Sequence, residues 1–336
     1  MIRMVRMIER TTLSRRIEPA DCESPSLTGR CGSSVIPDAI LFLFTFAVLI
    51  VISCVTSSAQ SAIELSQNLF VADMFNHRIL EYSPGGARTT FASFLGYPTA
   101  LAFDSGGNLY DADESTGKVY KFANVGGFLN PSPILLASGL SNPEGLAFNS
   151  AGDLFVACLS GSVIRITPSG TQSIFAAGLN QPMGVTFDLA GNLYVSDQYA
   201  NNIYRYTPDG SRSTFATGME IPYGMTLSGS GNLLVACWGG GELIQITPDG
   251  VKTTFASGFG FGIQDVTVNS LGDVFVSSPQ NSTIYGVVGG SPVTFATGLA
   301  PFGMAFQPVP EPATWSLLLL GALTLLGGCR MRSRSS

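Results

Sequence analysis

Six side chains stand at corresponding places in a pattern that recurs about every 40 residues, and they are the candidates for one ligand-binding site. They are Thr99, Glu144, Met183, Tyr223, Gln264 and Phe302. The set is mixed and partly aromatic, with a single carboxylate, and this suits ligand binding at a pocket mouth better than acid–base catalysis. The pattern therefore predicts binding residues and no catalytic residue.

Histidine and aspartate narrow the chemistry further. His77 is the only histidine in the chain, which excludes a His-rich zinc site and leaves a Ser-His-Asp triad only one possible base. Asp73, Asp113 and Asp197 recur at one place in the pattern. We interpret them as structural caps rather than a metal ring, because Asp accepts hydrogen bonds from the backbone N–H groups of a following turn.

The elements that position these side chains follow from the same repeat. Counterparts of Asn192 stand at Asn68, Asn108, Asp153, Asn232 and Asp273, at spacings of 40, 45, 39, 40 and 41 residues. Each unit contains four short apolar runs bounded by Gly, Asn, Pro and Asp. Tight hairpins at Asp209-Gly210 and Asp249-Gly250 would join the third and fourth runs. Four strands in about 40 residues are typical of a propeller blade, so the sequence predicts an all-β, six-bladed β-propeller.

The ends of the repeat predict how the ring closes. First-strand patterns cover residues 99–103, 144–148, 183–187, 223–227 and 264–268, and the sixth copy comes last, at 302–306. The first unit therefore lacks an inner strand of its own, and we expect the last segment to supply it by strand exchange, which leaves no open edge. The loops that lead into first strands and those between second and third strands then share one face, around the mouth of a central channel.

Residues 71–79, Val-Ala-Asp-Met-Phe-Asn-His-Arg-Ile, resemble the NHL repeat, and the resemblance covers all six units. Only the first unit keeps the histidine. NHL units are similar to the propellers of the SMP-30/gluconolactonase and streptogramin-lyase families, so the resemblance implies the fold more firmly than an activity. Streptogramin lyases use a catalytic histidine elsewhere in their ring, and the position of the single His77 disfavours that activity.

The similarity to SMP-30-like lactonases implies one specific alternative. Those enzymes hold a divalent cation at the channel mouth through Glu, Asn and Asp, and residues 142–145, Asn-Pro-Glu-Gly, resemble one of their ligand-bearing segments. A hard cation needs several convergent oxygens, and Asp265 is the nearest second acid to Glu144 in the pattern. The resemblance leaves open a lactone or ester hydrolase with calcium or another divalent cation on these two residues. The leading expectation has no cofactor.

Residues 1–59 are typical of an export signal. Residues 39–55 form an uncharged apolar stretch, and the arginines at positions 3, 6, 10, 15 and 16 favour a cytoplasmic leader before it. Three fates remain open for this segment. It is cleaved after the small residues Ser57, Ser58 and Ala59, or retained as a signal anchor, or lipidated at Cys54.

Residues 309–336 contain three parts in a fixed order. These are the motif Pro310, Glu311 and Pro312, an apolar run over 315–329 that would form a transmembrane helix, and the basic cluster Arg330, Arg332 and Arg334. The order resembles the PEP-CTERM sorting tail of exopolysaccharide-producing Gram-negative bacteria, and the resemblance implies an exosortase-type partner. The propeller is then residues 60–308, exported to the outer surface or the extracellular matrix. Terminal helices would anchor it in the inner membrane, either transiently before processing or permanently.

Charge limits the class of partner. Residues 60–306 hold 8 Lys plus Arg against 17 Asp plus Glu, a net charge of −9, whereas the whole chain has −6 because nine arginines lie in the two ends. A phosphate backbone needs clustered cations, so an acidic module excludes nucleic acid as the partner. We expect a binding or scaffold module for an extracellular polysaccharide or a protein, with Tyr199 and Trp238 among its contact aromatics.

Overall fold

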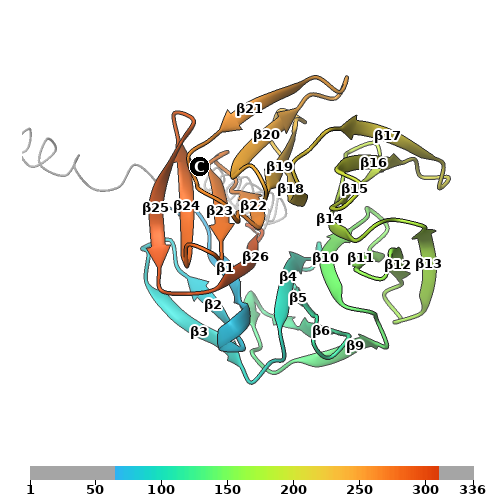
Figure 1. Ribbon diagram of the computed structural model, residues 1–336. Helices are drawn as coiled ribbons and strands as arrows, with labels where there is room; N and C mark the ends of the chain where they lie inside the picture. Colours follow the sequence, from blue (N-terminus) through green and yellow to red (C-terminus); the bar gives the residue numbers. More distant parts are fainter. Residues whose placement is uncertain (1–64, 310–336) are drawn as a thin grey trace, which may run out of the picture. The chain divides into compact units, whose positions relative to one another are not determined.

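The computed structural model describes residues 65–309 (Figure 1). The expected export signal lies outside these residues, as do both expected terminal helices and all of the sorting tail except Val309. No helix within residues 65–309 is long and apolar enough to cross a membrane. These residues form an all-β propeller of six four-stranded sheets, as the repeat predicted.

Each blade is an antiparallel sheet whose first strand borders the central channel. Blade 1 contains β26 (Pro301–Phe306), β1 (Leu69–Asp73), β2 (Arg78–Tyr82) and β3 (Arg88–Ser93), with the short 3-10 helix η1 (Met74–Asn76) after β1. Blade 2 contains β4 (Pro98–Phe103), β5 (Leu109–Asp113), β6 (Lys118–Phe122) and β9 (Ile134–Ser138). A separate hairpin of β7 (Asn124–Val125) and β8 (Phe128–Leu129) is inserted in blade 2 and accounts for its longer 45-residue spacing.

The other four blades follow the same plan. Blade 3 contains β10 (Pro143–Phe148), β11 (Leu154–Cys158), β12 (Ser162–Ile166) and β13 (Gln172–Ala177), and blade 4 contains β14 (Pro182–Phe187), β15 (Leu193–Asp197), β16 (Asn202–Tyr206) and β17 (Arg212–Thr217). Blade 5 contains β18 (Pro222–Leu227), β19 (Leu233–Cys237), β20 (Glu242–Ile246) and β21 (Lys252–Ala256). Blade 6 contains β22 (Asp265–Val268), β23 (Val274–Ser278), β24 (Thr283–Val288) and β25 (Ser291–Thr297).

The six first strands form a complete circuit. In the order β26, β4, β10, β14, β18 and β22, each contacts the next, and β22 contacts β26 (Figure 1). β26 pairs antiparallel with β1, so that Phe70 lies opposite Ala305 and Val71 opposite Met304. The last segment of the described chain therefore forms the first strand of blade 1.

The apolar core lies between the blades rather than within any one of them. Between blades 1 and 2, for example, Phe70, Leu101 and Phe122 pack in one buried cluster. Because neighbouring blades cover both faces of a blade, every second strand is buried along its full length, as β1, β5 and β11 illustrate. This explains why the second strands have continuous apolar runs in the sequence instead of strict alternation.

The recurring aspartates cap the loops that lead into the first strand of their own blade. Asp73 accepts a hydrogen bond from the Ala300 N–H at 2.7 Å. Asp113 accepts one from the Gly96 N–H at 2.7 Å and one from the Thr116 N–H at 3.1 Å, in the turn that follows β5. Asp197 accepts one from the Asn180 N–H at 2.8 Å. The three aspartates are structural caps, as interpreted, but the backbone that all three cap is the loop into the first strand, and the hydrogen bond from the Thr116 N–H to Asp113 caps the following turn.

Adjacent first strands approach one another so closely that one position requires a residue without a large side chain. Gly184 is an example, because a Cβ there would lie 2.5 Å from the Tyr223 carbonyl oxygen of the next blade. At Gly303, a Cβ would lie 2.6 Å from the Ala100 Cα. The strand register places Asp265 at the same position in blade 6, opposite Ser277, which makes blade 6 the exception.

Blade 2 contains an exception of another kind, a carboxyl in the apolar core. Asp111 in β5 is fully buried, and neither of its carboxyl oxygens has a hydrogen-bond partner. By alternation it lies on the same face as Leu109, which packs against blade 1. The other five blades have valine at this position, namely Val71, Val156, Val195, Val235 and Val276. Burial raises the pKa of Asp111 well above its usual range, and the nearby charge of Asp113 adds to this shift.

Replacing Asp111 with Val should raise the free energy of unfolding at pH 7 by on the order of 2–4 kcal/mol, because it removes a buried carboxyl without partners. Since its pKa is raised in the folded state, the folded protein binds the proton more tightly than the unfolded chain. The gain from Asp111→Val should therefore grow as the pH rises above the ordinary aspartate pKa. Urea denaturation at pH 5 and pH 7 measures both effects.

Asp113→Ala is the matched control for this prediction. It removes a carboxylate only two residues away that does accept backbone hydrogen bonds, so it should lower the free energy of unfolding. An Asp111→Val variant less stable than the wild type would contradict the account of the buried carboxyl.

Candidate functional site

The central channel contains a cavity of about 370 Å³ between the six first strands. Five of the six candidate residues line it, namely Thr99, Glu144, Met183, Tyr223 and Gln264, and Asp265 lines it as well. No Lys, Arg or His is among the residues that line this cavity. The structure thus brings together a site with acidic, amide and aromatic side chains and no basic one.

Phe302 lies apart from this cavity. Its ring packs edge-on against Phe75, with ring centroids 5.7 Å apart, and Phe75 also contacts Tyr97. His77 stacks on Tyr97, and its Nδ1 lies 2.6 Å from the Gly96 carbonyl oxygen, so this nitrogen donates. These aromatic residues form a separate cluster over blades 1 and 2, in which the single histidine holds a loop.

Thr99 lines the cavity, but its hydroxyl is occupied within the protein. The Oγ1 atom lies 2.9 Å from the Pro143 carbonyl oxygen of blade 3 and 3.0 Å from the Ala112 carbonyl oxygen of its own blade. The side chain is buried, and it links the first strands of two blades. Ser196 and Ser277 make comparable links, to the carbonyl oxygens of Tyr223 and Phe302. Thr99 therefore has a structural role that the repeat pattern did not reveal.

Glu144 is a carboxyl group at the cavity wall on β10. It is half-buried, because protein surrounds it except on the channel side. Burial raises its pKa well above the usual range, and the nearby negative charge of Glu114 adds to this effect. No cationic residue faces it from the cavity wall. Ionised Glu144 is consequently a strong acceptor without a basic partner in the wall.

Three aromatic rings gather at blades 5 and 6, and one of them, Tyr223, lines the cavity. Tyr223 stacks on Trp238, with ring centroids 5.1 Å apart and planes inclined by 23°, and Phe261 meets Trp238 edge-on at 5.5 Å. We call Tyr223, Trp238 and Phe261 the aromatic rim. Burial raises the pKa of Tyr223 to about 12, and the negative charge of Glu144 contributes. The tyrosine therefore stays neutral, and its hydroxyl remains available as a donor.

Gln264 faces Glu144 from the other side of the ring and has an unmet hydrogen-bonding capacity. It stands just before β22 in blade 6, whereas Glu144 is in blade 3, three blades away in a ring of six. Only 7% of Gln264 is exposed, and its side-chain Oε1 has no hydrogen-bond partner. A buried acceptor without a donor is unfavourable, so this amide oxygen is suited to a donor from a ligand.

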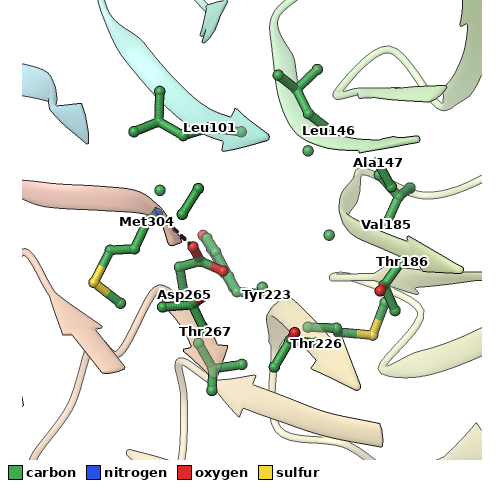
Figure 2. Close-up of a pocket in the computed structure, with 18 of the residues that line it drawn as sticks. Leu101, Leu146, Ala147, Val185, Thr186, Tyr223, Thr226, Asp265, Thr267 and Met304 are labelled. Atoms are coloured by element: carbon green, nitrogen blue, oxygen red, sulfur yellow. Dashed lines mark hydrogen bonds between the residues drawn. The ribbon is translucent and has the colours of Figure 1, made fainter. Parts of the chain in front are cut away.

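Asp265 follows Gln264 and bonds across the boundary between blades 6 and 1. Its Oδ2 accepts a hydrogen bond from the Met304 N–H at 2.8 Å (Figure 2). Burial raises its pKa to about 7, although the hydrogen bonds from the Met304 and Val266 N–H groups act in the opposite direction. A carboxyl group thus occupies the place where four other first strands have glycine.

The residues present do not fit a divalent cation held by Glu144 and Asp265. The two acids belong to opposite blades, and one Asp265 oxygen is already bonded to a backbone N–H. Within residues 65–309, no three His, Cys, Asp or Glu side chains gather closely enough to hold a metal ion. A hard cation needs more convergent oxygens than this arrangement offers.

Other residues at the site were not predicted from the sequence. The Gln198 side chain hydrogen-bonds to Tyr223, and Phe261 is 58% exposed at the outer side of the rim. Thr186, Thr226 and Thr267 line the cavity wall in blades 4, 5 and 6, where the other three blades have alanine. The threonines were visible as a difference between repeat units, but the polar side of the channel emerges only when the blades are placed in order.

Comparison with protein families gives one partial match. Residues 160–257 match the model described as the SMP-30/Gluconolactonase/LRE-like region. This segment contains Met183 and Tyr223 from the cavity wall, but it includes neither Glu144 nor Asp265. A comparison with curated proteins gave no match.

Solved structures share the fold at low sequence identity. A chain of the nidogen/laminin complex has a TM-score of 0.65 and 19% identity, over 72% of this chain and 99% of that one. A streptogramin B lyase has a TM-score of 0.56 and 17% identity, over 70% and 83%. Virginiamycin B lyase from Staphylococcus aureus has a TM-score of 0.55 and 16% identity, over 73% and 90%. These likenesses support the propeller fold and do not assign an activity.

Asp265→Asn should reduce the loss of stability that accompanies rising pH. A folded-state pKa of about 7, well above the ordinary value for aspartate, means that the contribution of this group to stability is greatest at low pH and is lost as the pH rises towards 7. Asparagine keeps an acceptor for the Met304 N–H but does not titrate. The difference in unfolding free energy between pH 5 and pH 8 should shrink by on the order of 2 kcal/mol. Urea denaturation provides the test, and an unchanged difference would show that Asp265 does not titrate in this range.

Proposed function

We propose that this protein is a ligand-binding propeller that takes up its ligand at the channel mouth and performs no chemistry of its own. The observation that carries the proposal is the buried, unpartnered Oε1 of Gln264 at a cavity that Glu144 and Tyr223 also line. A pocket with aromatic walls and a few unmet hydrogen-bonding groups is the usual form of a binding site.

Two classes of ligand fit this face of the propeller, and they differ in size. A saccharide or a short segment of a protein would enter the cavity and contact the aromatic rim, because flat rings suit both sugar faces and interface anchors. A larger protein partner would also cover the second aromatic cluster, where Phe75 is 60% exposed and packs against Phe302. Substitutions in the two aromatic clusters therefore distinguish a small ligand in the cavity from a large protein partner that covers the face around the channel mouth.

The second candidate is a metal-dependent lactone or ester hydrolase. The match to the SMP-30/Gluconolactonase/LRE-like region favours it. The positions of Glu144 and Asp265 on opposite blades weigh against it, so we rank it below binding. A calcium titration monitored by calorimetry separates the two, since the hydrolase requires stoichiometric metal that is lost in Glu144→Gln.

We also propose that the propeller acts outside the cell. The apolar stretch in residues 39–55 and the Pro-Glu-Pro, apolar, arginine order of residues 310–334 support export and sorting by an exosortase-type partner. The net negative charge of the propeller suits partners other than nucleic acid. The polysaccharide-rich surface or matrix is then the proposed place of action.

Tyr223→Ala and Trp238→Ala should each weaken binding to isolated extracellular polymer or to the protein partner about tenfold, because each removes a ring from the aromatic rim. Phe94→Ala is the control, since Phe94 is 98% exposed and does not line the cavity. Phe75→Ala should weaken the binding of a large partner only. Pull-down and calorimetry with each variant measure these effects, and equal binding by Tyr223→Ala and the wild type would exclude the channel mouth as the site.

Replacing Pro310, Glu311 and Pro312 by alanine should keep the protein in the membrane fraction and out of the extracellular fraction, because the sorting partner would no longer recognise the tail. Cell fractionation with an antibody against the propeller provides the measurement. Mass spectrometry of the extracellular wild-type protein would show whether the arginines at 330–334 are removed. An unchanged distribution of the variant would contradict sorting through this motif.

A further inference from the structure

The channel mouth gathers two carboxyl groups and an unpartnered amide oxygen without any basic side chain. Glu144 and Asp265 line the cavity with Gln264, and no Lys, Arg or His side chain does so. The buried Oε1 of Gln264 lacks any donor, which is an observation independent of the two acids. A ligand that satisfies these groups must donate hydrogen bonds.

The acceptors lie on two opposite walls of the channel. Glu144 extends from β10 in blade 3, and Gln264 and Asp265 belong to blade 6. Threonine hydroxyls line the wall on blades 4, 5 and 6, at Thr186, Thr226 and Thr267 (Figure 2). A ligand with one donor at each end and an aliphatic centre would therefore meet acceptors at both ends.

The aromatic rim favours positive charge for the same ligand. Tyr223 and Trp238 stack in blade 5, and Phe261, just before blade 6, adds an exposed third ring, so the rim lies on the side of the channel where Gln264 and Asp265 stand. The negative charge of Glu144 also acts on Tyr223. Aromatic faces attract ammonium groups, most strongly where water is partly excluded. A neutral sugar could use the rings but would leave the carboxyls without a counter-charge.

We infer that the channel mouth binds an alkylammonium ligand, and that a linear diamine fits it best. The inference rests on the proposed binding function and specifies the class of ligand. One ammonium group bonds to Glu144, and the other bonds to Gln264 and Asp265 on the opposite wall, where the aromatic rim also lies. The cavity of about 370 Å³ has room for such a small molecule.

Affinity should depend on pH in a defined direction. The groups that face Glu144 are Glu114 and Tyr223, and those that bond to Asp265 are the Met304 and Val266 N–H groups. None of them is cationic, so an ammonium group would be the first positive partner of either acid. Because an alkylamine stays protonated below about pH 10, affinity should rise between pH 6 and pH 8 as the pKa of Asp265, about 7, is passed. The raised pKa of Glu144 acts in the same direction.

The test is calorimetric titration of the full-length chain with 1,4-diaminobutane, 1-aminobutane and 1,4-butanediol. The diamine should bind, the monoamine should bind at least tenfold more weakly, and the uncharged diol should not bind. Glu144→Gln should weaken diamine binding at least tenfold and keep the part of the rise with pH that Asp265 causes. Asp209→Asn, which removes an exposed acid on the outer turn of blade 4, should leave both unchanged.

Gln264→Glu serves as a second variant with the opposite effect. A carboxylate at this place should strengthen diamine binding severalfold, which loss of folding cannot imitate. Thermal melts of each variant identify any that fail to fold. Binding of the diol as tight as that of the diamine, or a weakening of diamine binding by Gln264→Glu, would overturn the inference.

Three further outcomes decide between this inference, the proposed function and the hydrolase. If amines fail to bind while a polysaccharide or peptide binds in a manner that requires Trp238, the inference is wrong and the binding function stands. If calcium binds stoichiometrically and Glu144→Gln abolishes that binding, both the inference and the proposed binding function are wrong, and the metal-dependent hydrolase is supported. If no ligand of any class binds, both are wrong.

Discussion

Contact between the backbones of neighbouring first strands is the constraint on which the rest of this molecule depends. Gly145, Gly184, Gly224 and Gly303 lie where a Cβ would collide with the next strand, so four of the six strands approach their neighbours this closely only with glycine. The other two strands have Ala100 and Asp265 at this position. The candidate side chain of each blade stands just before this position. Glu144, Met183 and Tyr223 precede a glycine and line the cavity, as do Thr99 before Ala100 and Gln264 before Asp265, whereas Phe302 before Gly303 does not.

Two acids break the repeat, and each does so where the other units have a small or apolar residue. Asp265 stands at the glycine position and bonds to the next strand, whereas Asp111 stands at a valine position and bonds to nothing. Burial raises the pKa of both carboxyl groups, so the ionisation of each one lowers the free energy of unfolding as the pH rises. The first lies in the channel and the second lies between blades, which gives only Asp265 access to a ligand.

Much of the fold follows from the sequence, because a forty-residue repeat determines both the strands and their number. The repeat predicted the approximate limits of the first strands and the turns at Gly210 and Gly250. It also predicted that Asp73, Asp113 and Asp197 are caps. The site was less accessible, since equivalent repeat positions differ in what surrounds them. Thr99 turned out to bond to carbonyl oxygens, Phe302 to pack outside the cavity, and Gln264 to lack a partner. Those distinctions depend on contacts between blades, and a single-unit pattern contains no information about them.

The pairing of β26 with β1 has a mechanical consequence. Leu69, at the start of β1, lies opposite Phe306, at the end of β26, so the chain enters and leaves this sheet at the same end. A force that draws the two ends apart loads the hydrogen bonds of this pair one after another, as in opening a zipper, instead of shearing them together. Only Gln307, Pro308 and Val309 separate β26 from the Pro-Glu-Pro motif. A pulling force on the tail would therefore act first on β26, the strand that pairs with β1 and completes blade 1.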